Sequence, residues 1–254
     1  MKREDMNLRV LVVNADDLGF SADMNAAIEA GHRMGRITNA SLMVDGAAID
    51  EAIEIAGRNP GLGVGLHLDL CPVVGLYGRP YAQMREGLRL PETLDKVRAE
   101  TERQIQKFKG FGLSFTHLDG HRHFHALPEV FELVVEVAAA HGLKSIRLTK
   151  DWILPRTPSV YWTDEFFEAA LGLVRKHGIV IPDHFVYGTG EYSVDSFKPG
   201  VSELMVHVGQ QEEAYRNELD RLRSDDIWGP IHRADIQLSS YPALAERLNG
   251  CASA

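Results

Sequence analysis

The stretch that decides the fold class is Leu8–Asp17, LRVLVVNADD. Residues 8–14 form a short run rich in Leu and Val, which is typical of a parallel strand buried on both faces. Two adjacent carboxylates, Asp16 and Asp17, close the run. Parallel α/β folds place their chemistry at the carboxyl ends of the strands. We therefore expect a parallel α/β protein whose working residues lie where this strand ends.

Strand-like and helix-like segments alternate along the rest of the chain, which predicts a parallel sheet covered by helices. The number of strand candidates favours a barrel over an open sheet. No repeat, low-complexity tract or linker composition divides the sequence, so we predict a single-domain, distorted (β/α) barrel over residues 1–254. We expect the polar, glycine-containing segment 187–199 to be a mobile loop near the site. The expected strands are 8–14, 40–44, 63–70, 114–118, 145–148, 179–181, 185–187 and 203–208, and the expected helices are 21–34, 47–58, 92–110, 128–141, 163–177 and 212–223.

Composition excludes several classes of partner. The net charge is −9 and the sequence contains no block of Lys and Arg. This argues against a nucleic-acid partner and favours a small neutral or cationic ligand. Cys71 and Cys251 are far apart and imply no disulfide framework, so a reducing compartment is expected. The first residues are charged and no run reaches the roughly 18 apolar residues of a membrane span. We expect a soluble, cytoplasmic protein with no membrane partner, and the sequence leaves a homo-oligomer open.

A second cluster, Gly65-Leu66-His67-Leu68, lies near the end of the expected strand 63–70. Alternation places His67 on the same face as Gly63 and Gly65, opposite a face of Val and Leu. In a barrel, His67 would then point into the interior, where the two missing side chains leave room. A lone histidine in a strand is more often a core residue bonded to a backbone carbonyl, so this cluster decides nothing by itself.

The third cluster is the histidine-rich stretch Thr116–His125. Its histidines and Asp119 share one parity, so two or three can converge while the chain is extended, and we expect Gly120 to bend it. Such a stretch can equally be a surface metal scavenger or a polar loop, just as Asp16 or Asp17 can merely cap a helix. The coincidence of three clusters at three strand ends favours a metal site.

The chemistry of such a site requires more than the ligands. One divalent ion held by one Asp and two His, with positions left for water and substrate, is a common layout for metal-assisted hydrolysis. A carboxylate that binds the ion loses basicity, so a second carboxylate is needed to take the proton of the attacking water. Asp119 is suited to accept a hydrogen bond from a ligand histidine. His207, after the run Leu204–Val206, is the best remaining general acid, and we expect neighbouring carboxylates to raise its pKa. The competing interpretation is a polar residue at a strand end.

At these residues the chain resembles the YdjC-like (ChbG) carbohydrate deacetylase family, which is similar in metal site and mechanism to NodB-type polysaccharide deacetylases. The resemblance implies that Asp17, His67 and His121 hold the metal, that Asp16 is the base and that His207 is the acid. The chain departs from the family pattern in Val208, where a proline is usual, in Gly120 for Ser, in Leu18 for Phe and in Asp69-Leu70-Cys71. The matching segments are Asn14–Phe20, Thr38–Val44, Gly65–Leu68, Thr116–His125 and Leu238–Tyr241.

The resemblance implies hydrolysis of an N-acetyl group from an amino sugar or short chito-oligosaccharide, a small carbohydrate substrate. Two histidines and one carboxylate suit zinc or another first-row ion better than magnesium, although family members are often assigned magnesium. Two alternatives remain open: hydrolysis of another bond such as a phosphoester, for which only Arg122 and Arg147 lie near the motifs, and sugar or metal binding without turnover, against which Asp16 argues. The candidate aromatics for stacking on a sugar are Phe20, Tyr77, Tyr81, Trp152, Tyr161 and Trp162.

Overall fold

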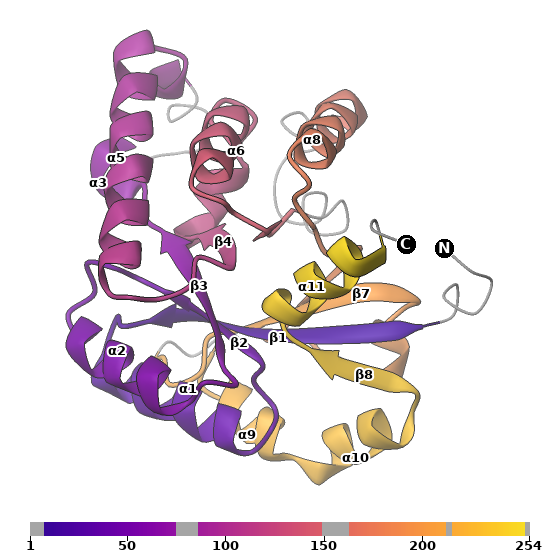
Figure 1. The fold of residues 1–254 in the computed structure, drawn as a ribbon. Coiled ribbons are helices and arrows are strands. Elements are labelled where there is room, and N and C mark those ends of the chain that lie inside the picture. The colour runs from indigo at the N-terminus through magenta and orange to yellow at the C-terminus, as the bar shows by residue number, and fades with distance from the viewer. Residues whose placement is uncertain (1–7, 75–85, 149–162, 212–214, 252–254) are drawn as a thin grey trace.

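A parallel sheet forms the centre of the protein in the computed structural model, which describes residues 8–74, 86–148, 163–211 and 215–251 (Figure 1). The sheet has eight strands in the order β5-β4-β3-β2-β1-β7-β6, and β8 pairs with β1. The strands are β1 (Arg9–Leu18), β2 (Asn39–Leu42), β3 (Gly63–Leu68), β4 (His117–Gly120), β5 (Ser145–Ile146), β6 (His184–Tyr187), β7 (Gly200–Val206) and β8 (Ile236–Ser239).

Strand β1 is the axis of this sheet because it has three parallel partners. β7 runs beside it from the Arg9–Gly200 pair to the Ala15–Val206 pair. On the opposite edge, β8 pairs with its first half and β2 with its second half. Residues 10–18 are all buried, as expected for a strand covered on both faces. The strand continues to Leu18, beyond the expected end at residue 14, so Asp16 and Asp17 lie within the strand, near its carboxyl end.

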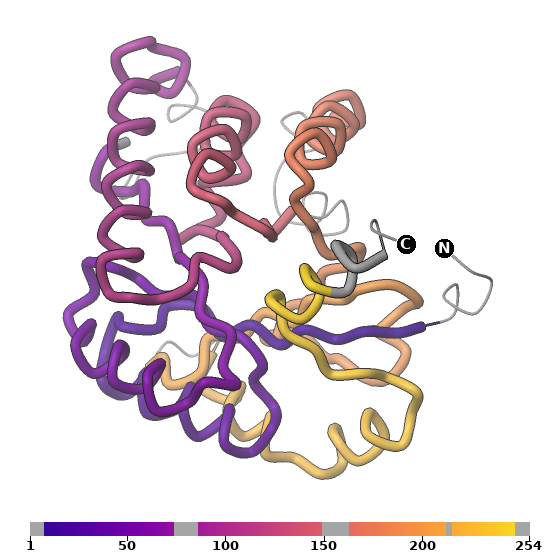
Figure 2. The backbone as a smooth tube through the Cα atoms, viewed as in Figure 1, coloured from indigo at the N-terminus to yellow at the C-terminus, as the bar shows by residue number. Residues whose placement is uncertain are grey.

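Helices cover the outer side of the curled sheet (Figure 2). Helices α5, α6 and α8 stand together over one part of it, and α1, α2, α9 and α10 lie over another (Figure 1). Ser21 caps α1 by accepting the Met24 N–H, and Thr163 caps α8 by accepting the Phe166 N–H. The helices are α1 (Ala22–Arg33), α2 (Ile49–Arg58), α3 (Cys71–Val74), α5 (Pro91–Gly110), α6 (Phe131–Ala140), α8 (Asp164–Lys176), α9 (Glu218–Arg223), α10 (Asp225–Arg233) and α11 (Tyr241–Cys251), with short 3-10 turns at η2 (His121–Ala126) and η3 (Val194–Ser196).

The predicted distorted (β/α) barrel is confirmed, with corrections to individual elements. The expected strand 179–181 is wrong: within it only Val180 pairs, through a single parallel bridge to Ser145 of β5. β5 is an edge strand of the sheet, and its partner at Val180 forms a bridge and not a strand. The barrel is therefore irregular at this edge. The segment containing α10, β8 and α11 was not predicted. The expected helix 212–223 is shorter, since α9 begins at Glu218, and residues 212–214 lie outside the described part.

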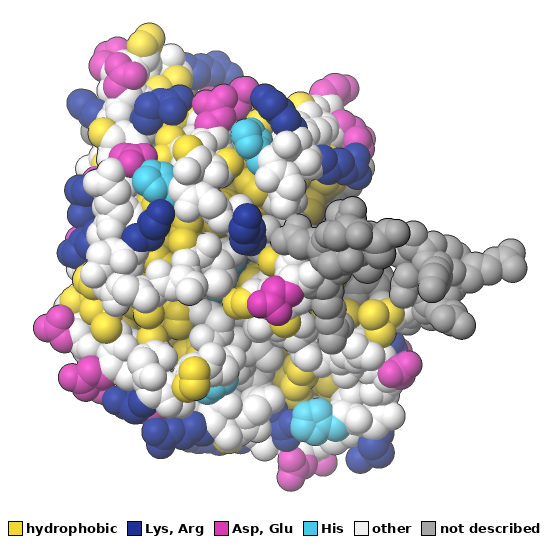
Figure 3. Space-filling model, viewed as in Figure 1, with side chains coloured by type: hydrophobic (Ala, Val, Ile, Leu, Met, Phe, Trp, Pro, Cys, Tyr) yellow, Lys and Arg dark blue, Asp and Glu magenta, His cyan; other side chains and the backbone are white. Residues whose placement is uncertain are grey.

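The surface carries mixed charge on the face drawn in Figure 3, where acidic and basic side chains are interspersed without a continuous basic patch. This agrees with the net charge of −9. Among the described residues, no helix is both long and apolar enough to cross a membrane.

The glycines of β3 make room for neighbouring strands, whereas the sequence predicted room for His67. A Cβ added to Gly65 would lie 2.5 Å from ring atoms of His117 on β4. A Cβ added to Gly63 would lie 2.5 Å from Nδ2 of Asn39 on β2. The His117 ring also stacks on Tyr241, with 4.6 Å between the ring centroids. Gly65 therefore lets an imidazole from the next strand fill the interior.

Replacing Gly65 by alanine should destabilise the fold, because the added methyl overlaps a buried ring that already contacts Tyr241. Overpacking of this kind costs about 1–3 kcal/mol. Urea unfolding measures the difference in free energy. The control is Gly172→Ala on α8, where a Cβ meets nothing within 4 Å, and this change should be neutral or stabilising by up to about 1 kcal/mol. Equal stability of the two variants would contradict this account of β3.

Candidate metal centre

Three side chains converge at the carboxyl ends of three strands. Asp17 comes from β1, His67 from β3, and His121 directly follows β4. Asp17 Oδ1 lies 3.1 Å from His67 Nε2 and 3.2 Å from His121 Nδ1. The three donor atoms all lie within 4.8 Å of one another. His121 is partly exposed while the other two are buried, so the cluster opens towards solvent on one side.

Neighbouring groups orient each donor atom. His67 Nδ1–H donates to Asp119 Oδ1 at 2.7 Å, which turns Nε2 towards the cluster, as is usual for histidine ligands of metals. Gln210 Nε2 donates to Asp17 Oδ2 at 2.8 Å and leaves Oδ1 facing the two imidazoles. Asp17 has φ +66°, an uncommon backbone conformation outside glycine that often marks a functional position. Gln210 was not foreseen, because no pattern links it to β1.

The electrostatics match a site that exchanges a proton for a cation. Burial raises the pKa of Asp17, but its hydrogen bonds and charge interactions with His121 and His67 outweigh burial and hold that pKa well below the usual value. Burial lowers the pKa of His67, but Asp119, Asp17 and Asp16 outweigh it and raise that pKa well above the usual value. Asp17 thus favours its anionic form while His67 retains a proton, and a divalent ion would replace that proton. Donor type, orientation and charge all fit a divalent metal.

A second group of donors, Asp16, His67 and Asp119, also lies within 4.8 Å. Arg147 already occupies this group from the other side. Its Nη2 lies 2.6 Å from Asp16 Oδ1 and 2.7 Å from Asp119 Oδ2. An ion there would compete with a buried guanidinium, so Asp17, His67 and His121 are the better candidate for a metal site.

Arg147 was considered only as a phosphate ligand from sequence, and the structure gives it another place. Its side chain is 1% exposed and contacts Asp16, Asp119 and Glu203. Both Asp16 oxygens accept from it, at 2.6 and 2.8 Å. Asn14 Nδ2 also donates to Asp16 Oδ1, at 2.8 Å. Asp16 is therefore held beside the three-donor cluster without belonging to it.

His207 directly follows β7 and faces Asp16, with 3.8 Å between Nε2 and Oδ2. The expected rise in its pKa is wrong: burial lowers the pKa of His207, and the nearby charges of Asp16 and Asp17 do not compensate. Its backbone N–H donates to Glu218 of α9, and its ring packs on Tyr215 at 4.5 Å between centroids. Burial raises the pKa of Glu218 to about 8. The hydrogen bond from the His207 N–H to Glu218 holds the backbone next to Val208, where the family usually has a proline.

The remaining histidines of the third cluster do not join the donors. His117 lies deeper, with Nε2 3.1 Å from Asn14 Oδ1. His125 Nε2–H donates to the Arg147 carbonyl at 2.9 Å, and His123 packs edge-on against Phe185. The expected bend at Gly120 is also wrong, because the chain turns at Arg122 and His123, which have φ +53° and +59°. Gly120 instead permits close approach of His125 Nδ1, 2.8 Å from an added Cβ.

Of the candidate sugar-stacking aromatics, only Phe20 is described, and it is 51% exposed just after β1. In the expected mobile loop, Tyr192 and Phe197 are buried. Tyr77, Tyr81, Trp152, Tyr161 and Trp162 lie outside the described residues.

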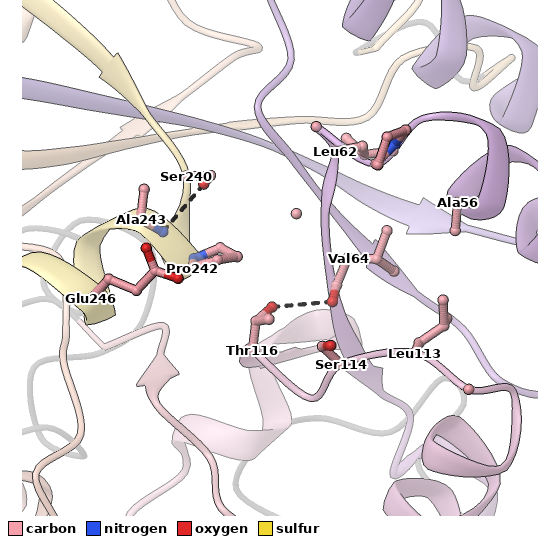
Figure 4. Close-up of a pocket in the computed structure, with 14 residues that line it drawn as sticks. Ala56, Leu62, Val64, Leu113, Ser114, Thr116, Ser240, Pro242, Ala243 and Glu246 are labelled. Carbon is pink, nitrogen blue, oxygen red and sulfur yellow. Dashed lines mark hydrogen bonds between the residues drawn. The ribbon is translucent and has the colours of Figure 1, made fainter.

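A cavity of about 530 Å³ lies away from the cluster, near the amino ends of β3 and β4 (Figure 4). Leu62, Val64 and Thr116 line it opposite Ser240 and Pro242 at the start of α11. None of the Asp and His donors lines it. The cavity is therefore separate from the candidate metal centre.

Comparison with known proteins agrees with this geometry. The model of the family described as YdjC-like protein matches residues 10–238, so the chain belongs to the YdjC-like family. The chitooligosaccharide deacetylases of Salmonella paratyphi B and Salmonella newport are each 39% identical to it over 158 residues. The alignment covers 58% of this chain and 62% of each relative, so the chain matches less than two thirds of these curated relatives.

Two solved structures share the fold. A protein of Enterococcus faecalis V583, described as a putative cellobiose-phosphate cleavage protein, is 20% identical with a TM-score of 0.72, covering 93% of this chain and 99% of its own. The lactam utilization protein of Thermus thermophilus is 16% identical with a TM-score of 0.54, covering 92% of this chain and 100% of its own.

We predict that one divalent ion binds per chain and that alanine at Asp17, His67 or His121 abolishes binding. Calorimetry with zinc on the metal-free protein measures the affinity. Asp119→Asn, which removes the partner of His67, should weaken binding about 10- to 100-fold. Asp16→Asn is the matched control, because Asp16 is not a donor of the assigned site. Full metal occupancy in His67→Ala would overturn the assignment.

Proposed function

We propose that this chain is a metal-dependent deacetylase that removes the N-acetyl group from an amino sugar or a short chito-oligosaccharide. The observation that carries the proposal is the pair Asp16 and His207, 3.8 Å apart, beside the three-donor cluster. The names of the curated relatives support the substrate class. We further propose that residues 1–254 work as one domain and that zinc or another first-row ion fills the site, since the donor set is His, His and Asp.

In this proposal Asp17, His67 and His121 hold the ion. When bound, the ion would polarise the amide carbonyl and lower the pKa of a water molecule. Asp16 takes a proton from the attacking water, because Arg147 and Asn14 fix its carboxylate and the metal does not use it. A bond forms between the water oxygen and the acyl carbon, the C–N bond breaks, and acetate and a free amine leave.

The departing nitrogen needs a proton, and His207 is placed to deliver it. Its lowered pKa leaves the imidazole neutral at neutral pH, so it must first gain the proton that it gives away. Asp16 Oδ2, 3.8 Å from His207 Nε2, holds a proton once the water is deprotonated. We propose that the proton passes from Asp16 through His207 to the amine, which uses one proton and balances the hydrolysis.

The structure gives less support to the alternative functions. Of the two arginines near the motifs that could bind a phosphoester, Arg147 is engaged by Asp16, Asp119 and Glu203, and only the exposed Arg122 beside His121 remains. Binding without turnover needs neither an unligated carboxylate beside the donors nor an imidazole facing it. No observation on the described residues favours either alternative over deacetylation.

Acetate release from a panel of N-acetylated sugars and chito-oligosaccharides tests the proposed function, with phosphate esters as the comparison. Asp16→Asn should keep the metal and lose about 100- to 10,000-fold in rate, the usual contribution of a general base. Metal analysis of the same sample separates the two effects. Loss of metal in Asp16→Asn with retention in Asp17→Asn would show that the two roles are exchanged.

His207→Ala should bind metal normally and lose most of its turnover on an N-acetyl substrate, by about 100-fold or more. An activated acetyl ester, whose leaving group needs no proton, should be far less affected. The ratio of amide to ester turnover in wild type and variant is the measurement. An equal drop for both substrates would make His207 a structural or binding residue. The acid would then be sought among His123, His125 and the half-buried His184.

A further inference from the structure

More carboxylates surround Arg147 than one guanidinium can neutralise. Asp16, Asp119 and Glu203 all lie within 2.8 Å of its nitrogens, and all are buried. Glu203 is fully buried in the middle of β7, and its hydrogen bonds go to Arg147 and away from the metal donors. Excess buried negative charge is costly unless other donors stabilise it. A further donor to Glu203 is therefore expected.

That donor is Tyr241, which lies in the Leu238–Tyr241 segment to which no role has been assigned. Its hydroxyl donates to Glu203 Oε2 at 2.5 Å, and its side chain is buried. Burial and Glu203 raise the pKa of the phenol well above its usual value, so the hydroxyl keeps its proton. Tyr241 begins α11, and its two chain neighbours, Ser240 and Pro242, line the cavity (Figure 4). Its backbone N–H donates to Asn39 Oδ1 at 3.3 Å, which fixes the start of the helix.

The first branch from Tyr241 to Asp16 runs through its hydroxyl. Glu203 Oε1 accepts from Arg147 Nε at 2.7 Å and also lies 2.7 Å from Nη2, which contacts Asp16 as well. Asp16 accepts from Nη1 and Nη2. Because the guanidinium is planar and rigid, fixing Glu203 fixes the plane in which Arg147 presents itself to Asp16.

The second branch runs through the ring of Tyr241. The ring stacks on His117 with 4.6 Å between centroids and 28° between planes. Burial lowers the pKa of His117 to about 4, so it is neutral, and its Nε2–H donates to Asn14 Oδ1 at 3.1 Å. The amide of Asn14 then donates to Asp16 Oδ1. Two chains of contacts thus start at Tyr241 and end on the same carboxylate.

We infer that Tyr241 is a positioning residue for Asp16, acting through Glu203 and Arg147 on one side and through His117 and Asn14 on the other. The inference rests on the proposed function, in which Asp16 is the general base. The described contacts of Tyr241 reach Asp16 only through these intermediaries and do not include the donors of the metal site. Its loss should therefore change the rate of the proton transfer and leave binding of metal and substrate nearly unaltered.

The test is Tyr241→Phe, which keeps the ring and its stacking and removes only the hydroxyl. We expect kcat to fall roughly 10- to 100-fold, as misplacement of a reacting group does, with KM and zinc affinity within about twofold of wild type. Tyr192→Phe is the matched control, because Tyr192 is also buried but packs against Phe197 and Arg221. A merely structural loss would lower the melting temperature without separating kcat from KM.

A double variant tests whether Tyr241 acts through Glu203. Glu203→Gln should reduce kcat by a similar factor, and adding Tyr241→Phe should reduce it little further, since both changes break the same chain. Multiplicative losses would mean that the two residues act independently and would overturn the first branch. If Tyr241→Phe fails to fold, Glu203→Gln carries the same kcat and KM comparison.

A readout without turnover separates this inference from the proposed function. In the metal-free protein, the Arg147 Nε–H should give a downfield NMR signal that is protected from exchange, because it donates to a buried carboxylate. Tyr241→Phe should shift this signal and Tyr192→Phe should not. A wild-type protein that releases no acetate overturns the proposed function, and the NMR comparison still decides the contact chain. An unchanged signal, or a kcat within about twofold of wild type, overturns the role of Tyr241.

Discussion

The buried guanidinium of Arg147 is the interaction on which the site depends. It follows β5 directly and contacts carboxylates on β1, β4 and β7, strands that are not all neighbours in the sheet. Removing one partner of such a buried group usually costs about 3–5 kcal/mol, because the other charge is left uncompensated. The same contact that closes the interior of the barrel thus fixes the carboxylate proposed to do the chemistry. Stability and the proposed catalysis would share one set of side chains here.

The donor cluster of Asp17, His67 and His121 is connected to Arg147 through Asp119. Asp119 Oδ1 accepts from His67, and its Oδ2 accepts from Arg147 and from Ser41 Oγ. Arg147 thus contacts Asp16 directly and reaches the candidate metal donors only at one remove, through Asp119 and His67. The two adjacent aspartates differ in their partners. Asp16 binds the guanidinium of Arg147, whereas Asp17, with φ +66°, faces His67 and the partly exposed His121.

Local patterns in the sequence were sufficient for most of the strands and for the three clusters that contain the candidate donors, but not for β8 or for residues 179–181. The apolar run before Asp16, the glycine-lined face of His67 and the single parity of His117, Asp119 and His121 all report on one strand at a time. Contacts between side chains on distant strands depend on how the sheet curls, and such contacts could not be predicted from patterns within one strand. Glu203 lies inside the apolar strand β7 and Arg147 directly follows β5, and these charges in apolar segments were the available signal that a buried ion pair joins them. Gln210 and Glu218 lie in loops or on a short helix, where no periodicity points to a partner.

The same limit explains the error on the pKa of His207. The carboxylates near this histidine are visible in the sequence, and Asp16 and Asp17 do raise its pKa. The burial that Tyr215 and the segment anchored by Glu218 impose is not visible there, and burial dominates. A neutral imidazole next to a fixed carboxylate is better suited to pass on a proton than to store one. The direction of this pKa therefore changes the proposed role of His207 from a standing acid to a relay fed by Asp16.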